Sequence, residues 1–118
     1  MNVDLYGIPN CDTVRRARRW LREAGVAHTF HDYRREGVDA ALLAHAADLL
    51  GWEALLNRRG TTWRRLAPSE RAAAADRGGA LELMVRQPTL IKRPLLLVDG
   101  RPRAVGFDPE RYRALLGV

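Results

Sequence analysis

The first third of the chain changes its hydrophobic period twice. Val3 and Leu5 alternate with polar neighbours, which is typical of a short strand. From about Asp12 to Gly25 apolar residues recur at helical spacing, and the glycine is a natural C-terminal stop. The apolar positions of this predicted helix are Val14, Ala17, Leu21 and Ala24. Val26–Tyr33, rich in aromatic and β-branched residues, predicts a second strand, so a βαβ unit with two parallel strands is expected.

The middle of the chain is predicted to be helical. Asp39 can cap a helix that ends at Gly51. Its apolar positions are Leu42, Leu43, Ala46, Leu49 and Leu50. A short turn at Trp52–Leu56 leads into Asn57–Trp63, which has no clean period and is predicted to be a loop.

Two shorter helices are predicted after this loop. Ser69 can cap a helix over Glu70–Arg77, which the Gly78-Gly79 pair would end. Ala80–Arg86 forms the next helix, ended by the proline that follows. The segment before the last strands is therefore expected to be helical up to about residue 88.

The last third returns to strands. Pro94–Val98 is a continuous apolar run, as expected of a strand buried on both faces. Asp99-Gly100 is a strong signal for a two-residue hairpin, with Pro102–Gly106 as the antiparallel return strand. Asp108-Pro109-Glu110 combines a capping acid, a proline and a first-turn acid, so a closing helix is expected up to about Leu116.

The order of these elements predicts an α/β fold. The chain has 118 residues, a length that suits one domain with a single core. Hydrophobic residues make up 47% of the sequence, which indicates a packed globular fold rather than disorder. We therefore expect a single domain over 1–118.

The cysteine content and the apolar runs indicate a cellular compartment. A single cysteine excludes an internal disulfide, which favours a reducing environment. The N-terminus has no basic region followed by a long apolar core, and the longest apolar run, Leu95–Val98, is too short to span a bilayer. A cytoplasmic protein without membrane contact is expected.

The positive charge is nearly all arginine. The formal net charge is +6, and Lys92 is the only lysine. The arginines are scattered, with no basic tail and no interleaved aromatic residues, so we expect a solvated surface rather than a nucleic-acid interface. The alternative is that a few arginines bind an anion.

Cys11 is the strongest candidate for chemistry. It follows the Gly7–Asn10 turn and lies where the first helix begins. Unpaired N–H groups and the helix dipole favour the reactive thiolate at such a position. The alternative is a small buried hydrophobe, which is the common environment of a free cysteine. Asp12 or Thr13 could cap this helix.

The histidines indicate no metal site. His28, His31 and His45 lack the spacing of metal ligands, and no cysteine pairs with them. His45 shares a predicted helix face with Leu42 and Leu49 and is interpreted as structural. No bound cofactor is expected.

Four stretches together resemble the ArsC family of arsenate reductase-like proteins. They are Tyr6–Thr13, Leu55–Trp63, Gln87–Pro94 and Val105–Phe107. The resemblance runs over nearly the whole chain and is closest to the YffB-type branch, regarded as glutathione-dependent thiol reductases. It implies a thioredoxin-like fold, with a mixed four-stranded sheet and an inserted helical segment at about 38–88. It also implies a cis peptide bond between Arg93 and Pro94 that faces Cys11.

The resemblance implies roles for individual residues. Cys11 is the nucleophile, and Arg93 matches the arginine that binds the oxyanion or the glutathione adduct in this family. A planar guanidinium suits such anions, and its charge stabilises the thiolate. The other substrate-binding residues that the resemblance implies are Asn10, Arg58, Arg59 and Pro94.

Two departures from the family pattern favour a thiol substrate over arsenate. Asn57 stands where arsenate reductases have a middle-loop arginine, and Gly106 stands where a third arginine follows the hairpin. An oxyanion that loses its water needs charged donors in exchange. In addition, Val14 replaces the second cysteine of a CxxC motif, so an outside thiol must resolve any mixed disulfide of Cys11.

These features together predict a glutathione-dependent thiol–disulfide reductase with a single cysteine nucleophile. Glutathione would be its co-substrate rather than a bound cofactor. One alternative is arsenate reduction, with glutathione and glutaredoxin completing the cycle. The other is an Spx-like module without catalytic activity that binds RNA polymerase, although Spx-like proteins often carry the CxxC pair that is missing here.

Overall fold

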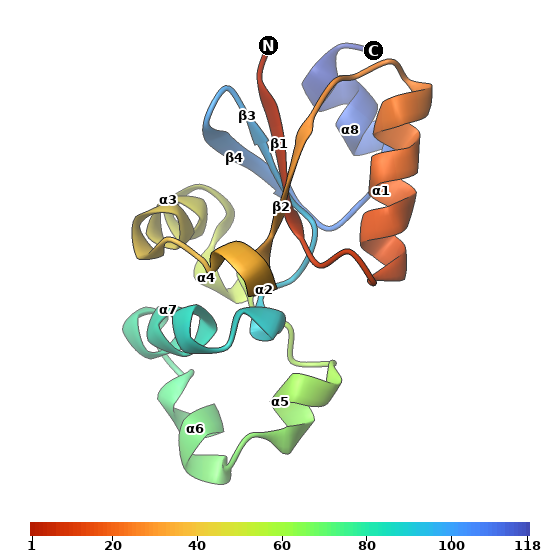
Figure 1. The fold of residues 1–118 in the computed structure, drawn as a ribbon. Coiled ribbons are helices and arrows are strands. Elements are labelled where there is room, and N and C mark those ends of the chain that lie inside the picture. Colours follow the sequence, from red (N-terminus) through yellow and green to blue (C-terminus); the bar gives the residue numbers. More distant parts are fainter.

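The computed structural model covers residues 1–118 and is built on a four-stranded sheet with the order β2-β1-β3-β4. The strands are β1 (Val3–Gly7), β2 (Thr29–Asp32), β3 (Leu95–Val98) and β4 (Arg101–Val105). β1 is parallel to β2 and antiparallel to β3, and β3 pairs with β4 in an antiparallel hairpin. The predicted mixed sheet, with a βαβ unit followed by a hairpin, is confirmed (Figure 1).

Helices cover both faces of this sheet. α1 (Asp12–Glu23) and α8 (Pro109–Leu116) lie on one side, and the other helices lie on the opposite side or beyond the end of the sheet (Figure 1). The chain has two apolar cores, and successive residues of β3 alternate between them. Leu96 packs with Leu5 and Tyr112 in one core, whereas Leu95 and Leu97 belong to the other. The apolar run in β3 is therefore buried on both faces, as predicted.

The segment between β2 and β3 contains seven of the chain's elements, all of them helical. Its elements are α2 (Tyr33–Glu36), α3 (Ala40–Leu50), α4 (Trp52–Leu55), α5 (Thr61–Arg65), α6 (Pro68–Ala73), α7 (Arg77–Arg86) and the 3₁₀ turn η1 (Pro88–Leu90). Figure 1 shows α5 and α6 at the end of the molecule opposite the two chain termini. No helix in the chain combines the length and the apolar character needed to cross a bilayer.

Short-range signals fix the ends of several elements. The Asp39 carboxylate accepts a hydrogen bond from the Ala41 N–H at 2.9 Å, and the Asp108 carboxylate accepts one from the Glu110 N–H at 3.1 Å. Both acids thus cap helices where the sequence predicts it. Asp99-Gly100 has φ values of 51° and 78°, as in the left-handed turns that favour tight hairpins.

The predicted helix end at Gly78-Gly79 is wrong. Both glycines lie in the first turn of α7, which begins after Asp76. The Asp76 carboxylate accepts a hydrogen bond from the Gly79 N–H at 2.8 Å. A Cβ atom at Gly79 would lie 1.7 Å from the carbonyl oxygen of Ala73. Glycine is needed at position 79 because the backbone of α6 approaches the start of α7. The Gly78-Gly79 pair therefore does not form the turn between the two helices.

The cap predicted for the preceding helix is also wrong. α6 begins at Pro68, and the residue before it, Ala67, is the N-cap. The Glu70 carboxylate reaches back and accepts a hydrogen bond from the Ala67 N–H at 3.0 Å. Ser69 therefore lies inside the first turn, because a proline can occupy the first helical position and an acid in that turn can satisfy the N-cap.

The loop predicted at Asn57–Trp63 is only partly a loop, because α5 begins at Thr61. The Thr62 hydroxyl forms a hydrogen bond with the Thr89 hydroxyl at 2.9 Å, which attaches this helix to η1. A contact between residues so far apart in the chain leaves no trace in the local hydrophobic period.

The buried face of α3 is the predicted one except at Leu49, since Leu42 and Leu50 also pack against the core. Leu43, Ala46 and Ala47 are buried, whereas Leu49 is 39% exposed. His45, interpreted as structural, is exposed and does not belong to the core. The small side chains of Ala46 and Ala47 lie in the core, and Leu49 faces solvent.

Candidate functional site

Cys11 is the N-cap of α1 and directly follows the loop from β1. Its backbone is extended, with φ −98° and ψ 127°, and the thiol is free and partly buried. The predicted caps, Asp12 and Thr13, are wrong, because both lie within the first turn. The Asp12 side chain is 92% exposed and pairs with Arg15, so its charge is partly neutralised away from the sulfur.

The surroundings of Cys11 favour the thiolate. Burial raises the pKa of the Cys11 thiol, but the nearby Val14 N–H, Arg93 guanidinium and Thr13 N–H stabilise the thiolate and outweigh this effect. The positive charge of Arg93 acts in the same direction, and the resulting pKa lies below the ordinary value for cysteine. The helix start and the cation together produce the microenvironment of a reactive cysteine.

Cys11 opens onto a pocket of about 250 Å³. The residues that line it are Cys11, Thr13, Asn57, Lys92, Arg93 and Gly106. They come from four parts of the chain: the start of α1, the segment between α4 and α5, the segment before β3, and the turn after β4. The lining contains two cationic side chains and no carboxylate, so it should attract an anionic group.

A short antiparallel bridge places Asn57 and Lys92 at this pocket. It joins the segments 55–57 and 90–92, which lie before and after the helices α5, α6 and α7. The Lys92 N–H donates to the carbonyl oxygen of Leu55 at 2.7 Å, and the Asn57 N–H donates to that of Leu90 at 2.8 Å. Backbone pairing thus fixes the position of both residues.

Two backbone carbonyl groups hold the Arg93 guanidinium in place. Its Nη1 donates hydrogen bonds to the carbonyl oxygens of Thr89 at 3.0 Å and Ile91 at 3.3 Å. The Arg93–Pro94 peptide bond is cis, as the resemblance implies. Pro94 is buried, and its carbonyl oxygen accepts a hydrogen bond from the Gly106 N–H at 2.8 Å, which keeps the turn after β4 beside the pocket.

The two arginines expected in the middle loop do not line the pocket. The Arg58 guanidinium lies over the rings of Trp52 and Trp63, at 5.9 and 5.7 Å from their centroids. Arg59 is exposed on the surface next to it. In this arrangement Arg58 packs against aromatic rings, and neither arginine is a lining residue.

Asn10 also lies outside the pocket lining, although it directly precedes Cys11. Its side-chain oxygen accepts a hydrogen bond from the Arg34 guanidinium at 2.9 Å. This bond ties the loop before α1 to α2.

Sequence reasoning did not identify Lys92 as a site residue. The available signal was that the only lysine of the chain directly precedes Arg93. The sequence suggests Thr13 only as a helix cap, whereas in the structure it lines the pocket and its N–H lowers the pKa of Cys11. The chain contains no group of three or more His, Cys, Asp or Glu side chains placed to hold a metal ion.

Comparisons with known proteins agree with this fold. The model of the ArsC family matches residues 6–115. The solved structure of a YffB protein is 46% identical, covers 96% of this chain and 97% of its own, and superimposes with a TM-score of 0.90. An arsenate reductase (ArsC) related protein from Brucella melitensis is 47% identical, with coverage of 100% and 97% and a TM-score of 0.75.

A relative with a different activity in its name is also similar. The global transcriptional regulator Spx 1 from Lactococcus lactis is 27% identical over 116 residues, which are 97% of this chain and 88% of the regulator. The set of similar proteins therefore includes both reductase-related proteins and regulators.

Proposed function

Because this chain belongs to the ArsC family, we propose that it is a thiol–disulfide reductase that uses Cys11 as its nucleophile and glutathione as its co-substrate. The observation that carries this proposal is the position of Cys11 at the start of α1 and beside Arg93 in one pocket. This position lowers the pKa of a thiol that opens onto a cationic pocket.

In the first step, the Cys11 thiolate attacks the glutathione sulfur of a protein–glutathione mixed disulfide. A new disulfide forms between Cys11 and glutathione, while the original disulfide bond breaks. The protein thiolate leaves with the electron pair and takes a proton from water. Arg93 would stabilise the attacking thiolate and hold a carboxylate of the glutathione moiety.

In the second step, the thiolate of another glutathione molecule attacks the glutathione sulfur bound to Cys11. Oxidised glutathione leaves, and the Cys11 thiolate returns. Overall, one mixed disulfide and one glutathione give one protein thiol and one oxidised glutathione, so two electrons pass from glutathione to the substrate. Since Cys11 is the only cysteine in the chain, an outside thiol has to perform this step.

The cations of the pocket suit glutathione as the partner. Glutathione is anionic at neutral pH because its two carboxylates outnumber its ammonium group. Arg93 offers a planar fork for one carboxylate, and Lys92 adds a mobile positive charge at the rim. Thr13 and Asn57 are neutral, so they add hydrogen-bonding capacity without opposing the anion.

Arsenate reduction is a weaker candidate. Lys92 favours it, because a lysine beside Arg93 gives the pocket a second cation. Asn57 and Gly106 oppose it, because they stand in the lining where the family pattern has arginines. An oxyanion stripped of water would then lack the charged donors that replace its hydration.

A regulatory role without catalysis is the candidate from another class, suggested by the similarity to Spx 1. Turnover separates it from the enzyme. Purified protein is incubated with a glutathionylated substrate protein and glutathione, and the release of oxidised glutathione is measured. The reductase proposal expects catalytic turnover that disappears in Cys11→Ser; formation of an adduct without turnover would contradict it.

The adduct itself provides a second test. The protein is incubated with oxidised glutathione, and the mass is measured before and after reduction. We expect one glutathione per chain, located on Cys11 by peptide mapping. Absence of an adduct, at a concentration that modifies an unstructured cysteine peptide, would remove Cys11 from the nucleophile role.

A further inference from the structure

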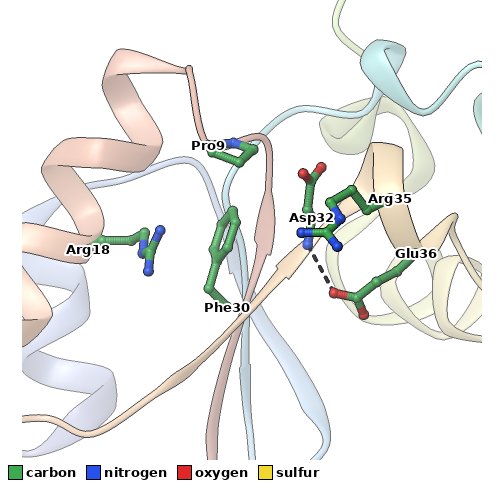
Figure 2. Close-up of a pocket in the computed structure, with 6 residues that line it drawn as sticks. All are labelled: Pro9, Arg18, Phe30, Asp32, Arg35 and Glu36. Atoms are coloured by element: carbon green, nitrogen blue, oxygen red, sulfur yellow. Dashed lines mark hydrogen bonds between the residues drawn. The ribbon is translucent and has the colours of Figure 1, made fainter.

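A second cavity lies between α1 and α2, at the end of β2 (Figure 2). Its volume is about 460 Å³, larger than that of the Cys11 pocket, and the two share no lining residue. The lining residues are Pro9, Arg18, Phe30, Asp32, Arg35 and Glu36. The sheet order places β2 on the side of β1 away from β3, so this cavity and the Cys11 pocket lie on different sides of the loop after β1.

The two arginines in this cavity have no anionic partner. Neither Arg18 nor Arg35 forms an ion pair, whereas Arg77 elsewhere on the surface pairs with Asp48 at 2.8 Å. Arg18 is fixed without such a partner: its guanidinium stacks on the Phe30 ring at 4.3 Å, and its Nε is buried with no hydrogen-bond acceptor. Two guanidinium groups, one of them held in place by stacking, thus remain available to a carboxylate.

The two acids in the cavity differ from each other. Both oxygens of Glu36 are engaged, one with His31 at 3.0 Å and the other with the Asp32 N–H at 3.2 Å. Asp32 uses one oxygen to cap α2, where it accepts a hydrogen bond from the Arg34 N–H at 2.9 Å. Its carboxylate points toward the Pro9 loop in Figure 2, and its second oxygen has no partner. The cavity therefore holds one acidic oxygen without a partner and two cations without an ion pair.

We propose that this cavity binds an α-amino-carboxylate zwitterion. The carboxylate would lie on Arg35 and the ammonium group on the free oxygen of Asp32, while Arg18 adds positive charge on the other side of the Phe30 ring. Phe30 and Pro9 supply apolar walls for the carbon chain of the ligand. A plain anion would be repelled by Asp32 and a plain cation by the arginines, whereas a zwitterion complements both signs.

Two ligand sources share this chemistry: a free amino acid, and the γ-glutamyl end of a glutathione molecule. The cavity lies close to Cys11 in the sequence, so binding of the γ-glutamyl end of glutathione there would place this ligand near the reactive thiol. Pro9 lies two residues before Cys11, and the Arg34–Asn10 hydrogen bond of 2.9 Å ties α2 to the same loop. Binding at this site requires no thiol chemistry, so the inference stands independently of the proposed reductase activity.

The test is a titration of the ¹⁵N-labelled full chain followed by NMR. The probes are glutamate, S-methylglutathione, which has no free thiol, and glutarate, which lacks the ammonium group. We expect saturable shifts of the Phe30, Asp32 and Arg35 amides with at least one zwitterion. Glutarate should bind about tenfold or more weakly, the loss expected for one charge-assisted hydrogen bond. Equal binding of glutarate and glutamate, or no saturable shift with either zwitterion, would overturn the proposal.

Three variants sharpen the result. Arg35→Gln should weaken zwitterion binding about tenfold, whereas Arg19→Gln, an exposed arginine on the same helix as Arg18, should leave it unchanged. Asp32→Asn keeps a helix-capping side chain but removes the negative charge. It should weaken glutamate binding and strengthen glutarate binding, an opposite response that a merely structural role of Asp32 does not produce. Equal losses in Arg35→Gln and Arg19→Gln would indicate nonspecific attraction and reject the site.

Glutamate and S-methylglutathione distinguish the two sources. Binding of S-methylglutathione but not glutamate assigns the site to a glutathione-type peptide, and the reverse result assigns it to a free amino acid. Either result supports the proposal, and both remain interpretable if the protein has no reductase activity.

Discussion

Arg93 lies beside Cys11 at the same pocket and lowers the pKa of its thiol, while the carbonyl oxygens of Thr89 and Ile91 hold the Arg93 guanidinium in place. The cation is therefore in place before any substrate arrives. A preorganised donor of this kind stabilises a developing or existing negative charge without further reorganisation. The first two predictions follow from this pair of residues.

The Cys11 thiol is expected to titrate below the ~8.5 of a free cysteine. The rate of alkylation by iodoacetamide, measured against pH, gives the midpoint. Arg93→Gln should raise that midpoint, because a donor and a positive charge are both lost, whereas the exposed Arg59→Gln should not move it. A midpoint at or above ~8.5 in the unmodified protein contradicts the assignment of Cys11 as an activated nucleophile.

The same pKa shift has a consequence for stability. Because the folded-state pKa of Cys11 is lowered, ionisation of this thiol stabilises the fold above the unfolded-state value near ~8.5. That contribution disappears as the pH falls through the folded-state pKa. The stability difference between the protein and Cys11→Ser, from urea unfolding, should therefore grow as the pH rises.

Arg93→Ala is expected to slow formation of the glutathione adduct more than it reduces stability. The variant loses a cation beside the sulfur, which corresponds to about a tenfold or greater drop in rate. Arg93→Lys keeps the charge but not the planar fork, and we expect an intermediate rate. The rates are measured by mass spectrometry and the stability by urea unfolding. A variant that is unstable but, while folded, reacts at the normal rate would show that Arg93 is purely structural.

Gly79→Ala is expected to destabilise the protein by about 2–3 kcal/mol, the usual range for forced overpacking. The new Cβ would lie 1.7 Å from the Ala73 carbonyl oxygen, so the backbone between α6 and α7 has to move. Gly78→Ala is the matched control: its nearest neighbour is 3.7 Å away, and alanine favours a helix over glycine. Urea unfolding of both variants measures the difference, and equal stabilities would rule out the close approach.

His31 is expected to make the stability depend on pH. Burial opposes its charge, but hydrogen bonds to Asp4 at 2.8 Å and Glu36 at 3.0 Å outweigh this effect, so the pKa of His31 is raised. Its charged form therefore stabilises the fold fully below the unfolded-state value of ~6.5, and this contribution is lost as the pH rises through the folded-state pKa.

A variant without the charge isolates this contribution. His31→Phe retains an aromatic ring to stack on Tyr6, whose centroid lies 4.2 Å from that of His31. The stability advantage of the unmodified protein over this variant should shrink between about pH 6 and pH 8, as followed by urea unfolding. A difference that stays constant over this range would mean that His31 does not change its charge there.

Much of this fold could be predicted because each signal lies within a few consecutive residues of the sequence. Asp39 and Asp108 cap the helices that they precede, and Asp99-Gly100 forms the hairpin turn. The Gly78-Gly79 pair misled the prediction for the opposite reason. Its glycine requirement comes from the nearby Ala73 carbonyl, a packing contact between two helices that local sequence does not reveal.

The candidate site was predictable to the extent that it depends on a motif. Cys11, Arg93 and the cis bond before Pro94 stand where the ArsC resemblance implies. The rest of the lining depends on chain pairing far from the motif. The bridge between 55–57 and 90–92 brings Lys92 to the pocket, while Arg58 is drawn to two tryptophan rings.

The last prediction concerns arsenate. The pocket holds Arg93 and Lys92 as its cations, with Asn57 and Gly106 at the positions of the family's other arginines. We therefore expect weak or absent arsenate reduction when glutathione and glutaredoxin are supplied, while glutathione-linked thiol exchange stays detectable. Arsenate would lose more hydration than these donors replace.

Restoring one cation tests this explanation. Position 106 is unsuitable, because Gly106 has φ +86°, where an arginine would be strained. Residue 57 has no such positive φ, so Asn57→Arg can supply the guanidinium there. Asn57→Gln controls for loss of the hydrogen bond that the Asn57 side chain accepts from the Arg59 N–H at 3.0 Å. Arsenate turnover should rise in Asn57→Arg relative to Asn57→Gln, by about tenfold for one added charged donor. Robust arsenate turnover by the unmodified protein would place arsenate reduction ahead of thiol exchange. Equal rates in the two variants would exclude the missing cation as the cause.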